Sequence, residues 1–117
     1  MLRILLVEDE ALIALVASIA LEEAGHHVIE AIDGEEGLKI ARQEQPELII
    51  TDYMMPRMNG LDMIERLRQD GFDRPIVLAT AIPEKDLPTR PQYDAYLHKP
   101  YREKDLLALL RRLMKEG

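Results

Sequence analysis

Leu48-Ile49-Ile50-Thr51-Asp52 is the most informative stretch of this 117-residue sequence. Three apolar residues that end at a hydroxyl and a carboxylate indicate a short strand buried on both faces, with a polar end. Similar apolar runs occupy residues 4–7 and 76–79. Such strands are typical of the centre of a parallel sheet, because helices cover both of its faces. Weaker runs at residues 28–29 and 95–97 supply two outer strands, so we expect five strands.

Segments with helical periodicity separate these runs. In the first segment apolar residues recur at helical spacing, which predicts a crossover helix: Leu12, Leu15, Val16, Ile19 and Ala20. Asp33 followed by Glu36 resembles a capping box that opens a second helix, which Pro46 stops. Asn59 opens a third helix, and leucines between residues 106 and 113 form the apolar stripe of the last one. The alternation predicts an α/β fold with a parallel sheet.

The connection between the fourth and fifth strands departs from this alternation. Pro83, Pro88 and Pro91 fall too close together for a regular helix of useful length. We expect at most one helical turn, at residues 84–87, and otherwise extended or irregular chain. The fourth helix of the pattern is therefore expected to be short or irregular.

The composition limits the classes of protein to which the chain can belong. With 47% hydrophobic and 32% charged residues, residues 1–117 have the size and the apolar content of a single domain. The formal net charge of -7 disfavours nucleic acid and anionic membranes as partners. The absence of cysteine excludes disulfides and thiolate metal sites. The uncharged stretch 11–21 is too short to span a membrane and the N-terminus is not a signal peptide, so we expect a cytoplasmic protein.

Polar side chains stand at the carboxyl ends of the expected strands, where open parallel sheets bind ligands. Glu8-Asp9 follows the first strand, Asp52 the third, Thr80 the fourth and Lys99 the fifth. Three clustered carboxylates repel one another unless a cation lies among them, and an oxygen-only donor set suits Mg²⁺. A carboxylate beside Mg²⁺, with a lysine and a hydroxyl opposite, is equipped to attack a phosphorus centre. Asp52 is best placed as that nucleophile.

These residues, in this order, resemble the receiver domain of two-component response regulators. The resemblance rests on Glu8-Asp9, residues 52–60, Thr80-Ala81 and Lys99-Pro100, and it covers about residues 3–115. It implies a flavodoxin-like, doubly wound sheet of five parallel strands in the order 2-1-3-4-5, as in chemotaxis regulators. The whole chain would then be one receiver, or phosphoacceptor, domain.

The resemblance implies a role for each carboxylate. Asp52 would be the phosphoacceptor and would take a phosphoryl group from a histidine kinase or a histidine phosphotransfer protein. Asp9 and Asp52 would bind Mg²⁺ directly, together with the backbone carbonyl of Met54. Glu8 would hold the ion mainly through water, and it departs from the family's commoner Asp at this position.

The resemblance also implies roles for residues on the other side of the pocket. Thr80 would hydrogen-bond one phosphoryl oxygen and Lys99 would pair with another, so both are catalytic candidates with Asp52. Tyr96 would be the switch aromatic that turns inward when Thr80 moves toward the phosphoryl group. The Lys99-Pro100 peptide is often cis in such domains. A partner protein would read the altered surface.

The function implied is that of a stand-alone response regulator of a two-component system or phosphorelay. The chain would be a signalling switch that catalyses its own aspartyl phosphorylation and dephosphorylation, and it would act on an unknown downstream protein. Only residues 114–117 follow the last helix, so no output domain is expected. Two alternatives stay open: an excised receiver of a longer regulator or hybrid kinase, and an unphosphorylated adaptor pseudo-receiver. A haloacid dehalogenase-type phosphatase fits less well, because Met54 stands where its second Asp is needed.

Overall fold

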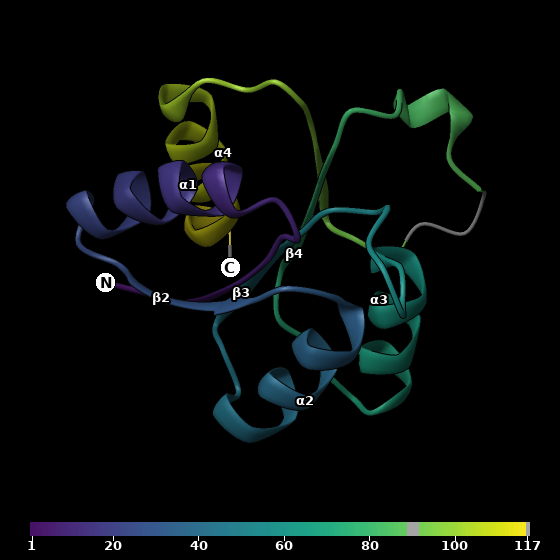
Figure 1. Cartoon of the computed structure of the whole chain (residues 1–117). Helices are drawn as coiled ribbons and strands as arrows, with labels where there is room; N and C mark the ends of the chain where they lie inside the picture. Colours follow the sequence, from purple (N-terminus) through teal and green to yellow (C-terminus); the bar gives the residue numbers. More distant parts are fainter. Residues whose placement is uncertain (89–91, 117) are drawn as a thin grey trace.

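The computed structural model describes residues 1–88 and 92–116, and strands alternate with helices along the chain (Figure 1). The elements are β1 (Arg3–Val7), α1 (Ala11–Glu23), β2 (His27–Ala31), α2 (Gly34–Glu44), β3 (Leu48–Thr51), α3 (Gly60–Gln69), β4 (Ile76–Thr80), the 3-10 turn η1 (Glu84–Asp86), β5 (Ala95–His98) and α4 (Glu103–Glu116). The five strands lie where the apolar runs predict them.

The strands form one parallel sheet in the order β2-β1-β3-β4-β5. β1 lies inside the sheet, where Ile4 is opposite Val28 of β2 and Leu48 of β3. Parallel neighbours need a crossover connection, and the helices that make these crossovers cover both faces of the sheet. The flavodoxin-like, doubly wound fold is therefore confirmed.

The sheet separates two apolar layers. One layer lies under α1 and α4, and the other lies under α2 and α3 (Figure 1). Successive residues of β1 alternate between them: Ile4 and Leu6 belong to the first layer, and Leu5 and Val7 to the second. All four side chains are buried. Burial on both faces is the reason that the strand reads as an uninterrupted apolar run.

Helix α1 is present as expected, but most of the apolar residues whose spacing predicts it lie on its exposed side. Its larger apolar side chains are between 46% and 72% exposed: Leu12, Leu15, Val16 and Ile19. The buried residues are mostly small: Ala14, Ala17, Ser18, Ala20 and Leu21. Because α1 is apolar on nearly every side, spacing does not distinguish its faces, and small side chains let it lie close to the sheet. At 13 residues it is too short to cross a bilayer, as are the other helices in the described ranges.

The helix starts predicted by capping residues are confirmed. The Asp33 carboxylate accepts a hydrogen bond from the Glu36 N–H at 2.8 Å, and the Asn59 side chain accepts one from the Asp62 N–H at 2.8 Å. These bonds satisfy amide groups that have no partner within the first turn of a helix. Helix α2 ends two residues before Pro46, as expected.

In its described part, the connection between β4 and β5 contains the single 3-10 turn η1, where the other crossovers have α-helices. Ile82, Leu87 and Tyr93 of this connection join the apolar layer under α2 and α3. The Tyr93 hydroxyl donates to the Glu84 carboxylate at 2.8 Å. Burial, together with this carboxylate, raises the pKa of Tyr93 to about 12. The expectation of a short fourth helix is confirmed, while the part of it that rests on Pro91 lies outside the described residues.

Candidate functional site

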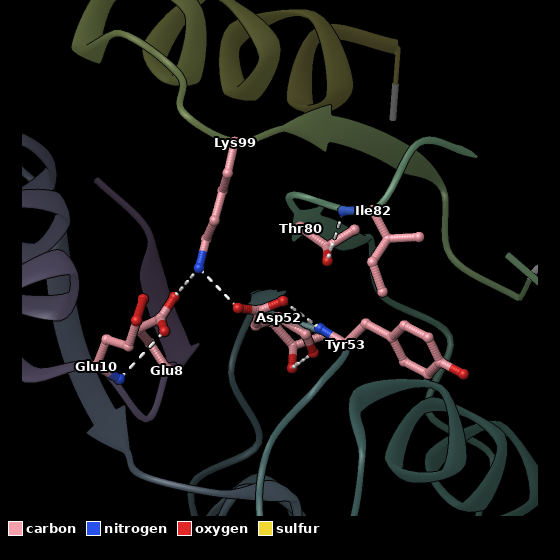
Figure 2. Close-up of polar contacts among 8 residues, drawn as sticks. Glu8, Glu10, Asp52, Tyr53, Thr80, Ile82 and Lys99 are labelled. Carbon is pink, nitrogen blue, oxygen red and sulfur yellow. Dashed lines mark hydrogen bonds and ion pairs between the residues drawn. The ribbon is translucent and has the colours of Figure 1, made fainter. Parts of the chain in front are cut away.

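Polar side chains from four neighbouring strands meet at the carboxyl edge of the sheet. Glu8 and Asp9 follow β1, Asp52 follows β3, Thr80 is the last residue of β4, and Lys99 follows β5. Figure 2 shows the side chains of Glu8, Asp52, Thr80 and Lys99 converging from these strand ends. Because the four strands are parallel neighbours, their ends open onto one site. The structure therefore brings these five predicted residues to the same edge.

The three carboxylates form a cluster that fits a divalent cation. One oxygen from each of Glu8, Asp9 and Asp52 lies within 4.8 Å of the other two. Glu8 is buried, Asp52 is half-buried and Asp9 is exposed, so the cluster has a buried side and a side open to solvent. Mg²⁺ prefers carboxylate oxygens and keeps several of its waters, which such a half-open site allows.

Lys99 lies between two of these carboxylates. Its Nζ donates to Glu8 Oε1 at 2.5 Å and to Asp52 Oδ2 at 2.7 Å (Figure 2). Burial lowers the pKa of Lys99, but its bonds to Asp52 and Glu8 together outweigh burial, and the pKa lies above its ordinary value. The lysine therefore stays charged and offsets part of the negative charge of the cluster.

Glu8 is the most deeply placed of the three acids. Its side chain is 4% exposed, and the Glu10 N–H donates to its Oε2 at 3.2 Å. Burial raises the pKa of Glu8 even though the bond to Lys99 lowers it. A second cation beside this carboxylate would offset more of the free-energy cost of burying its charge.

Short contacts with its neighbours fix the position of Asp52. The Tyr53 N–H donates to Asp52 Oδ1 at 2.6 Å, and the Thr51 hydroxyl donates to the Asp52 carbonyl at 2.9 Å. A Cβ on Gly60 would lie 1.9 Å from that carbonyl, so only glycine fits there. The Gly60 N–H in turn donates to the Tyr53 carbonyl at 2.7 Å. The start of α3 thus packs directly against the turn that carries Asp52.

Thr80 and Tyr96 are connected through one residue, Ile82. The Ile82 N–H donates to Thr80 Oγ1 at 3.4 Å, and the Ile82 carbonyl accepts a hydrogen bond from the Tyr96 hydroxyl. The same hydroxyl lies 2.9 Å from His98 Nδ1. Burial raises the pKa of Tyr96. A movement of Thr80 can therefore displace Ile82, and through the Ile82 carbonyl it can alter the hydrogen bond of Tyr96 in β5.

The remaining predicted features lie in the loops beside the cluster. Met54 lies in the loop after Asp52 with its side chain 59% exposed. The Lys99-Pro100 peptide is cis, as the resemblance implies.

Sequence reasoning did not predict the ion pair beside the site in which the guanidinium of Arg57 binds the carboxylate of Asp33. The sequence identified Asp33 as a helix-capping residue. No spacing rule, however, connects Asp33 to Arg57, which lies 24 positions away in another loop.

Comparison with known proteins identifies the family. The profile of the response regulator receiver domain matches residues 4–111. The alkaline phosphatase synthesis transcriptional regulatory protein PhoP of Bacillus subtilis is 36% identical over 98% of this chain and 49% of its own length. The DNA-binding dual master transcriptional regulator RpaA of Synechocystis is 38% identical over 97% of this chain and 49% of its own length. The chain spans about half the length of these relatives.

Solved structures give the same result. The response regulator TrrA of Thermotoga maritima, in complex with Mg²⁺ and BeF, has a TM-score of 0.88 and 32% identity, over 97% of this chain and 99% of that one. The chemotaxis response regulator CheY4 of Vibrio cholerae has a TM-score of 0.89 and 31% identity, over 97% of this chain and 98% of that one. With the sheet order and the acidic cluster, these matches show that the chain belongs to the response regulator receiver domain family of two-component signalling.

Proposed function

We propose that this chain is a phosphorylation switch whose acceptor is Asp52 and whose phosphoryl donor is a histidine kinase or a histidine phosphotransfer protein. One observation carries the proposal. The oxygens of Glu8, Asp9 and Asp52 cluster within 4.8 Å, and the Nζ of Lys99 lies 2.7 Å from Asp52. This arrangement combines a carboxylate nucleophile with groups that neutralise phosphoryl oxygens, which is what phosphoryl transfer needs.

Each residue has a distinct part in the proposed reaction. An oxygen of Asp52 attacks the phosphorus, a new O–P bond forms, and the P–N bond to the donor histidine breaks. As the phosphoryl group approaches, Lys99 and the hydroxyl of Thr80 each donate a hydrogen bond to one of its oxygens. Asp9, Asp52, the carbonyl of Met54 and, through water, Glu8 would hold Mg²⁺. The ion, when bound, neutralises charge on the phosphoryl group.

An apolar surface beside the site supports a protein as the donor. The exposed residues Leu12 and Val16 of α1 border a groove of about 460 Å³ that extends to Lys99, Pro100 and Tyr101. Exposed apolar surface of this kind marks contacts with other proteins. We assign the docking of the donor to this α1 face, because a partner bound there lies next to Lys99, which contacts Asp52.

The readout follows the Thr80 link. On phosphorylation Thr80 is drawn toward the added oxygens, Ile82 moves with it, and the Tyr96 hydroxyl loses its present partner. Tyr96 is therefore the proposed switch residue. The surface that a downstream protein would read includes β5 and the connection before it.

The chain could work in two contexts. A stand-alone, cytoplasmic regulator that acts on another protein is supported by the match to nearly the whole solved chain of CheY4, and by the net charge of -7, which disfavours nucleic acid. The relatives named as transcriptional regulators are about twice as long, and they support a second candidate, the receiver part of a longer DNA-binding regulator.

Intact mass spectrometry after incubation with acetyl phosphate and Mg²⁺ tests the acceptor. We expect the wild-type chain to gain one phosphoryl group, and we expect Asp52→Asn and a chelated wild-type sample to gain none. A folded wild-type chain that stays unmodified would contradict the proposal and favour the adaptor alternative.

A further inference from the structure

The loop between Asp52 and α3, residues 53–59, contains Met54, whose backbone carbonyl is a Mg²⁺ ligand in the proposed function. Its base is closed by the bond from the Gly60 N–H to the Tyr53 carbonyl. Between base and tip, Met55 and Met58 pack against the apolar layer under α2 and α3, whereas Met54 itself is 59% exposed. The position of the Met54 carbonyl therefore depends on the contacts on either side of it, including those at the tip of the loop.

Arg57 lies at that tip in an unusual backbone conformation. Its φ is +69°, in the left-handed region that residues other than glycine seldom adopt. Its Nε and Nη2 both bind Oδ2 of Asp33, at 2.8 and 2.6 Å. The side chain of Asp33 is 3% exposed, whereas that of Arg57 is 57% exposed. A strained residue thus reaches from the surface to a buried carboxylate.

Asp33 is a rigid anchor for this contact. Its Oδ1 caps α2 through the Glu36 N–H. That bond lowers the pKa of Asp33, burial opposes it, and Arg57 lowers the pKa further, so the net direction is downward and the carboxylate stays charged. Next to it, the Gly34 N–H donates to the Met58 carbonyl at 3.1 Å, and a Cβ on Gly34 would lie 2.2 Å from that oxygen. Two adjacent contacts therefore fasten the tip of the loop to the start of α2.

We propose that Arg57 is a positioning residue for the metal site, and that its ion pair with Asp33 keeps the Met54 carbonyl in place beside Asp52. The loop is held at its base by Gly60 and at its tip by Arg57, so the segment between these points has little freedom. The ion pair also offsets the cost of the left-handed backbone at Arg57. This inference rests on the proposed function, because it assumes that the Met54 carbonyl is a metal ligand.

The chain offers a matched control. Arg42 near the end of α2 pairs with Asp70 after α3 at 2.9 Å, and both side chains are half exposed. This second ion pair also connects the α2 and α3 units, but it lies at the opposite end of α2 from Asp33. Removing it loosens the same two units without touching the loop that carries Met54.

The test is the Mg²⁺ affinity of the unphosphorylated chain, measured by calorimetry or by NMR titration at neutral pH. Arg57→Gly accepts the left-handed backbone and removes the whole side chain, including the guanidinium. We expect its Kd for Mg²⁺ to rise about tenfold, as for other groups that hold a metal ligand in place. Arg57→Lys keeps a cation and should recover part of the affinity, and Arg42→Ala should leave the Kd unchanged. At saturating Mg²⁺, the rate of phosphorylation of Arg57→Gly by acetyl phosphate should return to that of the wild type.

The outcomes separate this inference from the proposed function. An unchanged Mg²⁺ affinity in Arg57→Gly overturns the inference, as does an equal loss in Arg42→Ala, which would indicate general loosening of the two helices. If Arg57→Gly does not fold, a wild-type affinity in Arg57→Lys together with an unchanged Kd in Asp33→Asn overturns it. A wild-type chain that binds no Mg²⁺ overturns the proposed function, and this inference with it.

Discussion

Lys99 holds two carboxylates at once, and this sharing sets the electrostatics of the site. Lys99 follows β5, and its bonds to Glu8 and Asp52 connect the end of β5 with the ends of β1 and β3. On the proposed function, Lys99 exchanges part of this pairing for a phosphoryl oxygen, so the positive charge is already in place before the donor arrives. The same arrangement leaves the Glu8 carboxylate buried, with Lys99 as its cationic partner among the described residues.

Replacing Glu8 by Gln is expected to raise the melting temperature at pH 7 and to weaken Mg²⁺ binding. Burial raises the pKa of Glu8 above its ordinary value of 4.5, so its ionisation is less favourable in the folded chain than in the unfolded one. The folded state therefore loses stability as the pH rises from that ordinary value through the raised one, and Gln removes this loss. Thermal melts without Mg²⁺ between pH 4 and 8 measure it. The advantage of Glu8→Gln in Tm should grow with pH, and an advantage that shrinks would contradict the prediction.

Gly60→Ala is expected to destabilise the chain and to slow phosphorylation of Asp52. The added methyl group would lie 1.9 Å from the Asp52 carbonyl, so the turn must shift at a cost of about 1–3 kcal/mol. Urea unfolding and the rate of labelling by acetyl phosphate measure the two effects. Gly71→Ala is the control, because nothing lies within 4 Å of its added methyl group. Its φ of +93° costs stability, but labelling should be unaffected. Equal labelling of both variants would show that the contact does not position Asp52.

At the level of elements, α1 shows what periodicity can and cannot predict. Its length and position follow from an uncharged, strongly apolar segment, and both are as expected. Its orientation does not follow from the sequence, because a helix that is apolar on all sides has several apolar faces, any of which could pack on the sheet. Packing decides between them: small residues such as Ala14 and Ala17 allow a close approach to the sheet, and Leu12 and Val16 are left outside.

The exposed face of α1 gives a prediction about donors. Val16→Glu places a charge where the side chain is 60% exposed, so stability should change by no more than about 0.5 kcal/mol. Labelling by acetyl phosphate should be unchanged, whereas transfer from a phosphorylated histidine phosphotransfer protein should fall. Ala17→Glu, one residue further along, puts the charge under the helix and should unfold the chain. Circular dichroism and the two labelling assays distinguish these cases. Equal loss with both donors would argue against docking on α1.

The candidate site was predictable to the extent that strand ends define it. Glu8, Asp52 and Lys99 each come directly after a strand, so their meeting place follows from the parallel sheet. The contact between Asp33 and Arg57 was not predictable, because two loops come together only after their helices have packed. The steric role of Gly60 was hidden for the same reason: a glycine in a loop does not reveal which backbone it approaches.

For the whole molecule, Mg²⁺ should stabilise the fold by mass action. Only the folded chain brings the acidic oxygens of Glu8, Asp9 and Asp52 within 4.8 Å, so the unfolded chain binds the ion weakly. A free Mg²⁺ concentration of 100 times Kd should add about 2.7 kcal/mol to the free energy of unfolding. Thermal melts across a Mg²⁺ series measure the shift, and Asp9→Asn should reduce it. A wild-type melting temperature independent of Mg²⁺ would show that the cluster is not a metal site.

The order of the strands also bears on how the chain is made. β1 is synthesised first but lies between β2 and β3, so both of its edges are paired only after residue 51 has left the ribosome. From there the sheet can grow in the order of synthesis, β4 onto β3 and then β5 onto β4. The carboxylates are therefore assembled early and the lysine arrives last. A nascent or truncated chain that lacks β5 has the acceptor without Lys99, and such an incomplete product is expected to stay silent in signalling.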